Sequence, residues 1–149
     1  MTAQTHNRGG EALRHRLFPY NPGDMYKVDR ETFEGLVTSA VEELPDTFRD
    51  RVTNIEFVVE ELASSDDYAR VGGGQGSTLL GVYRGIPLPR RGRRYNMALP
   101  DRIVIFQQPI QRLARSEADL SERVRHVVRH EIAHYFGISD ERLREIDAY

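Results

Sequence analysis

The stretch from Ser116 to Phe136 constrains the fold most, because its apolar residues recur at the spacing of one long helix. With a rotation of about 100° between successive residues, one stripe of that helix is formed by Leu120, Val124, Val127, Val128 and Tyr135. Glu131 projects within the same stripe. A carboxylate is costly to remove from water unless a cation lies beside it, so a purely structural helix would not place one there.

Two histidines stand on either side of this glutamate in the sequence. His130 and His134 are four residues apart, so they lie one helical turn apart at the border of the apolar stripe. Imidazoles placed in this way can converge on one metal ion, with metal–nitrogen distances of about 2.1 Å. The pattern H-E-x-x-H therefore indicates a metal ion that the two histidines hold, with Glu131 as its charged neighbour and not as a ligand.

A third ligand has to come from outside this helix, and Asp140 is the candidate. If the helix continued, Asp140 would lie about 9 Å beyond His134 along the helix axis. Gly137 can adopt the left-handed conformation that ends a helix, so the chain can turn and bring residue 140 back. Two structural interpretations stay open: Gly137 is an ordinary helix end, and Ser139 or Asp140 caps the last helix, expected over residues 140–146.

The rest of the chain predicts a single α+β domain over residues 28–149, preceded by a disordered tail over residues 1–27. A core helix is expected over 29–44, strands over 52–62, 79–83 and 102–106, and a short helix over 110–115. Residues 64–77 and 84–101 have the composition of loops, and the glycines of the first lack the Lys-Ser/Thr pair of a phosphate-binding loop. The order of elements favours a compact fold in which a small mixed sheet carries helices on one face.

Composition narrows the classes of partner and compartment. The net charge of −2 provides no general attraction to nucleic acid or to a membrane surface. The absence of cysteine excludes a disulfide framework and a thiolate metal site. No apolar run approaches the length of a membrane span, and the first residues lack the apolar segment of a signal peptide, so we expect a cytoplasmic location.

The motif "HEIAHYFGISD", residues 130–140, fits H-E-x-x-H-x-x-G-x-x-D, a zincin signature in which aspartate replaces the third histidine of most metzincins. With "LLGVYRGIPL", "LPDRIVIFQQPIQRL" and "RHVVRHEIAHYFGISDERLREI", the chain resembles the small bacterial zincin-like metallopeptidases, or minimal zincins, over about residues 29–147. The resemblance implies a compact α+β zincin fold, one zinc ion and a peptide or protein substrate. By position it implies that His130, His134 and Asp140 are the metal ligands and Glu131 the catalytic glutamate.

One feature of most metzincins has no counterpart in this sequence. They place a methionine turn beneath the metal, downstream of the third ligand, whereas the methionines here are Met1, Met25 and Met97. We therefore expect the sheet and the last helix to form the floor of the site. We also expect the usual C-terminal substrate-binding subdomain to be missing.

Three functions are compatible with these residues. In a zinc peptidase, the positive charge of the ion acidifies water, and Glu131 takes the proton of that water and passes it to the leaving amine. An extended peptide would pair with the edge of a strand beside the metal. A metal-stabilised binding or regulatory module with little turnover is the alternative, and the missing subdomain favours it. A metal-dependent endoribonuclease is the third; it is favoured by Arg90, Arg91, Arg93 and Arg94 and opposed by Glu131.

The sequence contains further candidate residues for the site. His126 continues the i, i+4 series, but one ion cannot bind side chains from three successive turns. His6 and His15 belong to the tail. Arg142 could hydrogen-bond Asp140, or could simply be an exposed helix residue. Three tyrosines are candidates to stabilise an oxyanion, and the sequence does not choose among them: Tyr83, Tyr95 and Tyr135.

Overall fold

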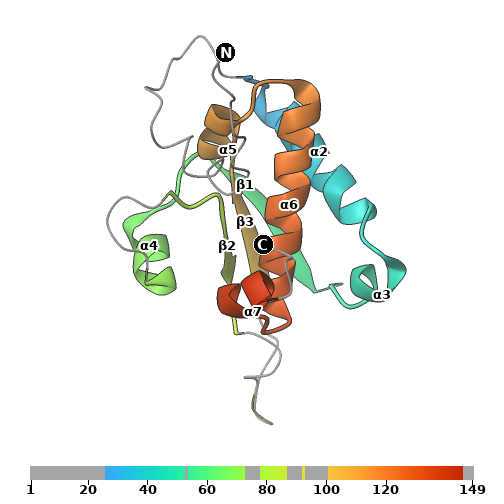
Figure 1. Ribbon diagram of the computed structural model, residues 1–149, viewed down its shortest axis with the longest axis vertical. Helices are drawn as coiled ribbons and strands as arrows, with labels where there is room; N and C mark the ends of the chain where they lie inside the picture. Colours follow the sequence, from blue (N-terminus) through green and yellow to red (C-terminus); the bar gives the residue numbers. More distant parts are fainter. Residues whose placement is uncertain (1–25, 53, 73–77, 87–91, 93–100, 146–149) are drawn as a thin grey trace, which may run out of the picture.

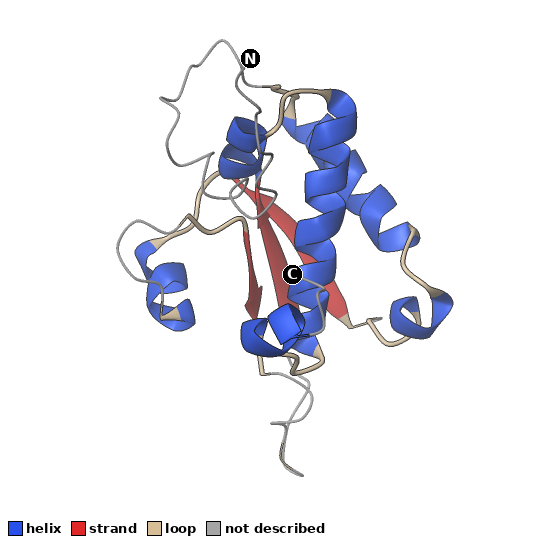
Figure 2. Cartoon of the chain, in the orientation of Figure 1, coloured by secondary structure: helices blue, strands red, loops and turns tan. Residues whose placement is uncertain are grey.

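The computed structural model describes residues 26–52, 54–72, 78–86, 92 and 101–145, and for Asp140, Leu143 and Arg144 it describes the backbone alone. Figures 1 and 2 show the arrangement of these residues. In chain order the elements are α2 (Arg30–Glu42), α3 (Asp46–Arg49), β1 (Ile55–Glu60), α4 (Ser65–Val71), β2 (Gly81–Arg84), β3 (Asp101–Phe106), α5 (Gln107–Leu113), α6 (Glu117–Tyr135) and α7 (Asp140–Glu145).

The three strands form one mixed sheet in the order β1-β3-β2. Strand β1 runs parallel to β3, with Ile55 opposite Asp101, and β2 runs antiparallel to β3, with Gly81 opposite Ile105. The central strand is apolar on both faces, and its residues from Ile103 to Phe106 are fully buried. This arrangement confirms the predicted α+β fold with a small mixed sheet.

Helices α2 and α6 pack against each other and cover one face of the sheet (Figure 1). Asp29 caps α2 by accepting a hydrogen bond from the backbone N–H of Thr32 at 2.8 Å. The buried residues of α2 are Phe33, Val37 and Ala40, and Phe33 is fully buried. On the opposite face of the sheet lies a smaller apolar cluster, whose buried members are Val82, Val104 and Phe106.

Residues 64–77 were predicted to form a loop, and this was wrong for the first half, which forms helix α4. Ser64 and Asp67 make a capping box, in which each side chain accepts a hydrogen bond from the backbone N–H of the other residue. Gly72 ends the helix with φ of 63°. The glycine-rich composition obscured a helix that is only seven residues long; residues 73–77 lie outside the described part of the chain.

Arg84 of β2 joins α4 to the sheet. Its guanidinium donates to the carboxylate of Asp67 at 2.8 and 2.9 Å and to that of Glu60 on β1 at 3.0 Å. Asp67 is almost fully buried, and its hydrogen bonds with Arg84 lower the pKa of its carboxyl group to about 2. Helix α4 is therefore fixed to the face of the sheet opposite α6.

The other expected elements are present, with shifted ends. Helix α5 begins at Gln107, three residues before the predicted start at 110, because Pro109 fits within its first turn. The short helix α3 was not predicted; it follows Pro45, which was expected to close the preceding segment. Most of the expected loop over residues 84–101 lies outside the described residues.

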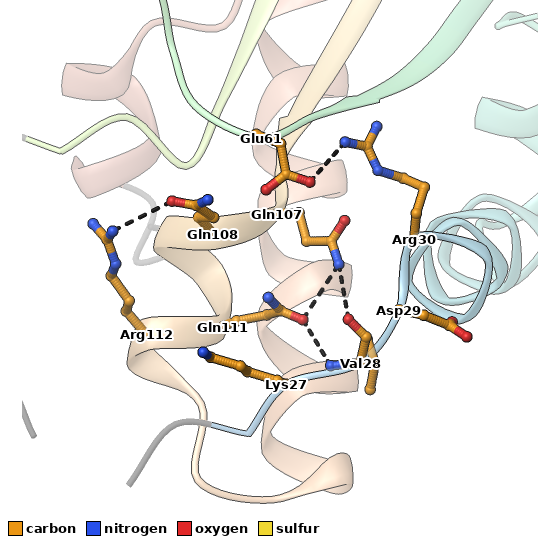
Figure 3. A pocket seen from close by; sticks show the side chains of 9 residues that line it. All are labelled: Lys27, Val28, Asp29, Arg30, Glu61, Gln107, Gln108, Gln111 and Arg112. Atoms are coloured by element: carbon orange, nitrogen blue, oxygen red, sulfur yellow. Dashed lines mark hydrogen bonds and ion pairs between the residues drawn. The ribbon is translucent and has the colours of Figure 1, made fainter. Parts of the chain in front are cut away.

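A polar cavity of about 480 Å³ lies where the start of α2, the end of β1 and α5 meet (Figure 3). Within it, Gln111 accepts a hydrogen bond from the N–H of Val28 at 2.8 Å, and Gln107 donates to the carbonyl of Val28 at 3.1 Å. Arg30 pairs with Glu61 at 2.8 Å. These contacts fix the segment that enters α2, and the cavity lining contains none of the predicted site residues.

Candidate metal centre

Helix α6 presents the predicted stripe to the core, and Glu131 lies within it. Leu120, Val124 and Val128 are fully buried, and Val127 and Tyr135 are nearly so. The exposed fraction of Glu131 is 5%, close to that of its apolar neighbours. Ser116 caps the helix by accepting a hydrogen bond from the N–H of Asp119 at 3.0 Å. A long helix with its own cap therefore carries a buried carboxylate into the core.

His130 and His134 lie beside this carboxylate on successive turns. Their ring centroids are 4.6 Å apart, and both side chains are half-buried. One ligand atom from each of His130, Glu131 and His134 lies within 4.8 Å of the others. Imidazole is a ligand type that zinc accepts, so the two histidines fit such an ion, with the carboxylate of Glu131 beside them. The predicted convergence of the two histidines is observed.

The contact between His134 and Glu131 affects which imidazole nitrogen can bind a metal. Nδ1 of His134 lies 3.3 Å from a carboxylate oxygen of Glu131. A neutral imidazole that donates from Nδ1 keeps its lone pair on Nε2. A carboxylate in this position also fixes the orientation of the ring. If Nδ1 of His134 carries the proton in this contact, Nε2 would be its ligand atom.

The C-terminus of α6 turns as predicted at Gly137, whose φ is 81°. The N–H of Gly137 donates to the carbonyl of His134, and the N–H of Ile138 donates to that of Ala133, both at 2.9 Å. These two bonds form a Schellman motif, which requires a left-handed residue at the position of Gly137. The chain therefore reverses direction immediately after the helix that carries the histidines.

Asp140 is the first residue of α7, and its side chain lies outside the described part of the chain. The side chain of Ser139 accepts a hydrogen bond from the N–H of Arg142 at 3.2 Å, so Ser139 caps α7. The structural interpretation that Ser139 caps the last helix is thus observed. The assignment of Asp140 as third ligand stays a prediction.

The remaining candidates divide into those that the structure places and those that it leaves out. His126 is exposed, its ring centroid is 6.3 Å from that of His130, and it is not among the three converging residues. Arg142 pairs with Glu145 at 2.8 Å on the surface. Outside the described residues lie His6, His15, Arg90, Arg91, Arg93, Arg94 and Tyr95.

Of the three tyrosines that are candidates to stabilise an oxyanion, the structure describes two, Tyr83 and Tyr135, and they contact each other near the C-terminal end of α6. Their rings pack edge to face, with 5.7 Å between the ring centroids, and Tyr135 is buried. The hydroxyl of Tyr83 donates to the buried carboxylate of Asp101 at 2.8 Å. The contact of Asp101 with Tyr83 was not predicted from the sequence, because nothing in the local pattern shows that the start of β3 lies beside Tyr83.

Comparisons with known proteins indicate the family and the fold of this chain. The chain matches the family described as zincin-like metallopeptidase over residues 52–149, which is more than half of its length. It is also similar to the solved structure of a conserved hypothetical protein from Thermus thermophilus, with a TM-score of 0.50 and 24% sequence identity. That similarity covers 73% of this chain and 94% of the other, and it supports the fold alone. No curated protein matches the chain.

Within the described ranges, no helix is both long enough and apolar enough to cross a membrane.

Proposed function

We propose, from the premise that this chain belongs to the zincin-like metallopeptidase family, that it is a zinc-dependent enzyme that hydrolyses peptide bonds. The observation that carries the proposal is the buried carboxylate of Glu131 beside two converging imidazoles. Within the described part of the chain, the side chain that pairs with this carboxylate is the imidazole of His134. A metal ion held by His130 and His134 would compensate the burial of the charge.

His130 and His134 would hold the metal, with Asp140 as the third ligand. When bound, a zinc ion with an open position lowers the pKa of water toward neutrality and polarises a carbonyl oxygen. Two observations support the two histidines as ligands. Their rings lie on successive turns of the helix, and Nδ1 of His134 lies beside a carboxylate that can orient the ring. Asp140 enters the proposal through its sequence position and through the chain reversal at Gly137.

Glu131 is the proton carrier in the proposed reaction. Its carboxylate accepts a proton from the attacking water and then donates it to the amine that leaves when the peptide bond breaks. Burial helps this role, because a side chain of a residue that is only 5% exposed has little freedom to turn toward bulk solvent. Its contact with His134 sets its orientation toward the two histidines.

The substrate is proposed to bind as an extended peptide along the outer edge of β2. Strand β2 pairs with β3 on one side, and no other described strand pairs with it on the other. Its residue Gly81 lies against the turn of α6 that carries Glu131. A peptide that added a strand to this edge would obtain backbone hydrogen bonds next to the proposed base.

The assignment of Asp140 predicts a specific effect of Gly137→Val. A β-branched residue resists a φ of 81°, so the chain should no longer reverse at this point and Asp140 should be displaced. We expect Gly137→Val to bind zinc less tightly by about tenfold or more, within the range seen when residues that orient metal ligands are lost. Zinc affinity is measured by competition with a chromophoric chelator.

Gly137→Asn is the matched control, because asparagine tolerates the left-handed region far better than valine does. It should bind zinc nearly as tightly as wild type. Equal zinc affinity in wild type and in a folded Gly137→Val protein would show that the chain reversal does not place a ligand.

The direct test of the proposed function is cleavage of a diverse peptide library by zinc-loaded protein, with an RNA panel alongside. We expect cleavage of peptides that stops when the metal is chelated and returns when zinc is restored. Cleavage of RNA without cleavage of peptides would identify a nuclease instead. Absence of turnover on both, with zinc bound, would favour the metal-stabilised binding module.

A further inference from the structure

The face of β2 that packs against α6 has no side chain at Gly81. A Cβ atom at this position would lie 2.8 Å from Cγ1 of Val127, 3.1 Å from Cγ of Glu131 and 3.1 Å from the carbonyl oxygen of Val104. The first distance is shorter than real Cβ contacts, and the other two are tighter than most. Gly81 is itself buried, so an added methyl group could not move out into solvent.

The requirement for glycine at this position is one of space and not of backbone conformation. Among the described glycines, Gly72 and Gly137 are the ones with positive φ, and Gly81 lies in a regular strand opposite Ile105. The two nearest neighbours on α6 cannot both yield, because Val127 is β-branched and stiff and Glu131 is buried in the core. The third neighbour is backbone of the central strand. An added Cβ must therefore move β2 away from α6 or displace the side chain of Glu131.

We propose that Gly81 is a positioning residue of the active site. It allows the edge strand to approach α6 so closely that the backbone of β2 forms one wall around the side chain of Glu131. The same strand offers its outer edge to the peptide, so the approach at Gly81 sets the distance between the bound substrate and the base. This inference rests on the proposed function in taking Glu131 as the base and the outer edge of β2 as the peptide site; the packing of Gly81 on Glu131 is a property of the fold.

The test uses zinc-loaded Gly81→Ala, with Gly35→Ala as the matched control. Gly35 lies on an exposed turn of α2, and a Cβ there would meet nothing within 4 Å. We expect Gly81→Ala to keep its zinc while kcat falls about 10- to 100-fold, as small misplacements of reacting groups do. KM should change much less than kcat, and Gly35→Ala should match wild type in both. Unchanged kcat in Gly81→Ala would overturn the proposal.

A second substitution separates positioning from packing alone. The clash with Val127 should lower the melting temperature of Gly81→Ala. Val127→Ala removes the methyl group that makes this closest contact. The double variant Gly81→Ala/Val127→Ala should therefore fold and recover at least part of that melting temperature. The contact with Glu131 remains in this double variant, and we expect kcat to stay low. Recovery of kcat together with the melting temperature would show that Gly81 acts only through packing with Val127, and would overturn the proposal.

A readout that does not depend on turnover keeps the two proposals distinguishable. Acetohydroxamate, a small zinc-binding probe that also hydrogen-bonds a neighbouring carboxylate, can be titrated calorimetrically into the zinc-loaded proteins. If wild type cleaves no peptide, the proposed function fails, and the dissociation constant of acetohydroxamate still decides the role of Gly81. Weaker binding by Gly81→Ala with zinc retained supports positioning of Glu131; equal binding by both proteins contradicts it.

Discussion

Zinc-loaded Glu131→Gln is expected to fold, to retain its metal and to lose about 10²- to 10⁴-fold in turnover on peptides, the contribution of a positioned proton-transfer group. The substitution keeps the size of the side chain and an oxygen at the end of it, where Glu131 now has an oxygen 3.3 Å from Nδ1 of His134. It removes the basic oxygen that takes the proton from water in the proposed reaction. Initial rates on a cleaved library peptide, with zinc content measured on the same sample, provide the comparison.

Glu122→Gln is the control for this experiment. Glu122 lies on the same helix but is exposed and pairs with Arg125 at 3.0 Å. Its substitution should leave turnover within about twofold of wild type, because surface ion pairs of this kind contribute little. Equal turnover in wild type and Glu131→Gln would remove Glu131 from the mechanism, and the buried carboxylate would then need a structural explanation.

The helix that carries this glutamate could be predicted from the sequence because its signals are local. The spacing of Leu120, Val124 and Val128 places Glu131 on the buried face without any knowledge of what packs against it. The helix end is equally local, since Gly137 provides the left-handed residue of a Schellman motif formed by consecutive backbone groups. The burial of Glu131 and the convergence of the two histidines followed from these local rules.

The surroundings of the helix could not be predicted, because they depend on contacts between elements far apart in the sequence. Gly81 appears in the sequence as one small residue before a short strand, and its contact with Glu131 exists only after β2 packs on α6. Asp101 meets Tyr83 for the same reason. Helix α4 was missed although its capping box is local, since the glycines that follow Val71 dominate the composition of the segment.

Substitution of His134 by alanine is expected to reduce the zinc content from about one equivalent per chain to near zero, because two remaining ligands cannot complete a site that needs three from the protein. The change also removes the imidazole that lies 3.3 Å from the buried carboxylate of Glu131. Some stability should therefore be lost with the metal. Elemental analysis after gel filtration measures the metal, and circular dichroism verifies that the variant is folded.

His126→Ala is the matched comparison, since His126 lies two turns before His134 on the same helix and is exposed. It should keep its zinc. Binding of a metal to the folded state raises stability by mass action, by about 4 kcal/mol when the free metal is 1,000 times its dissociation constant. A chelator should consequently lower the melting temperature of wild type and of His126→Ala, and leave that of His134→Ala unchanged. A folded His134→Ala protein that retains zinc and responds to the chelator like wild type would place the metal elsewhere in the chain.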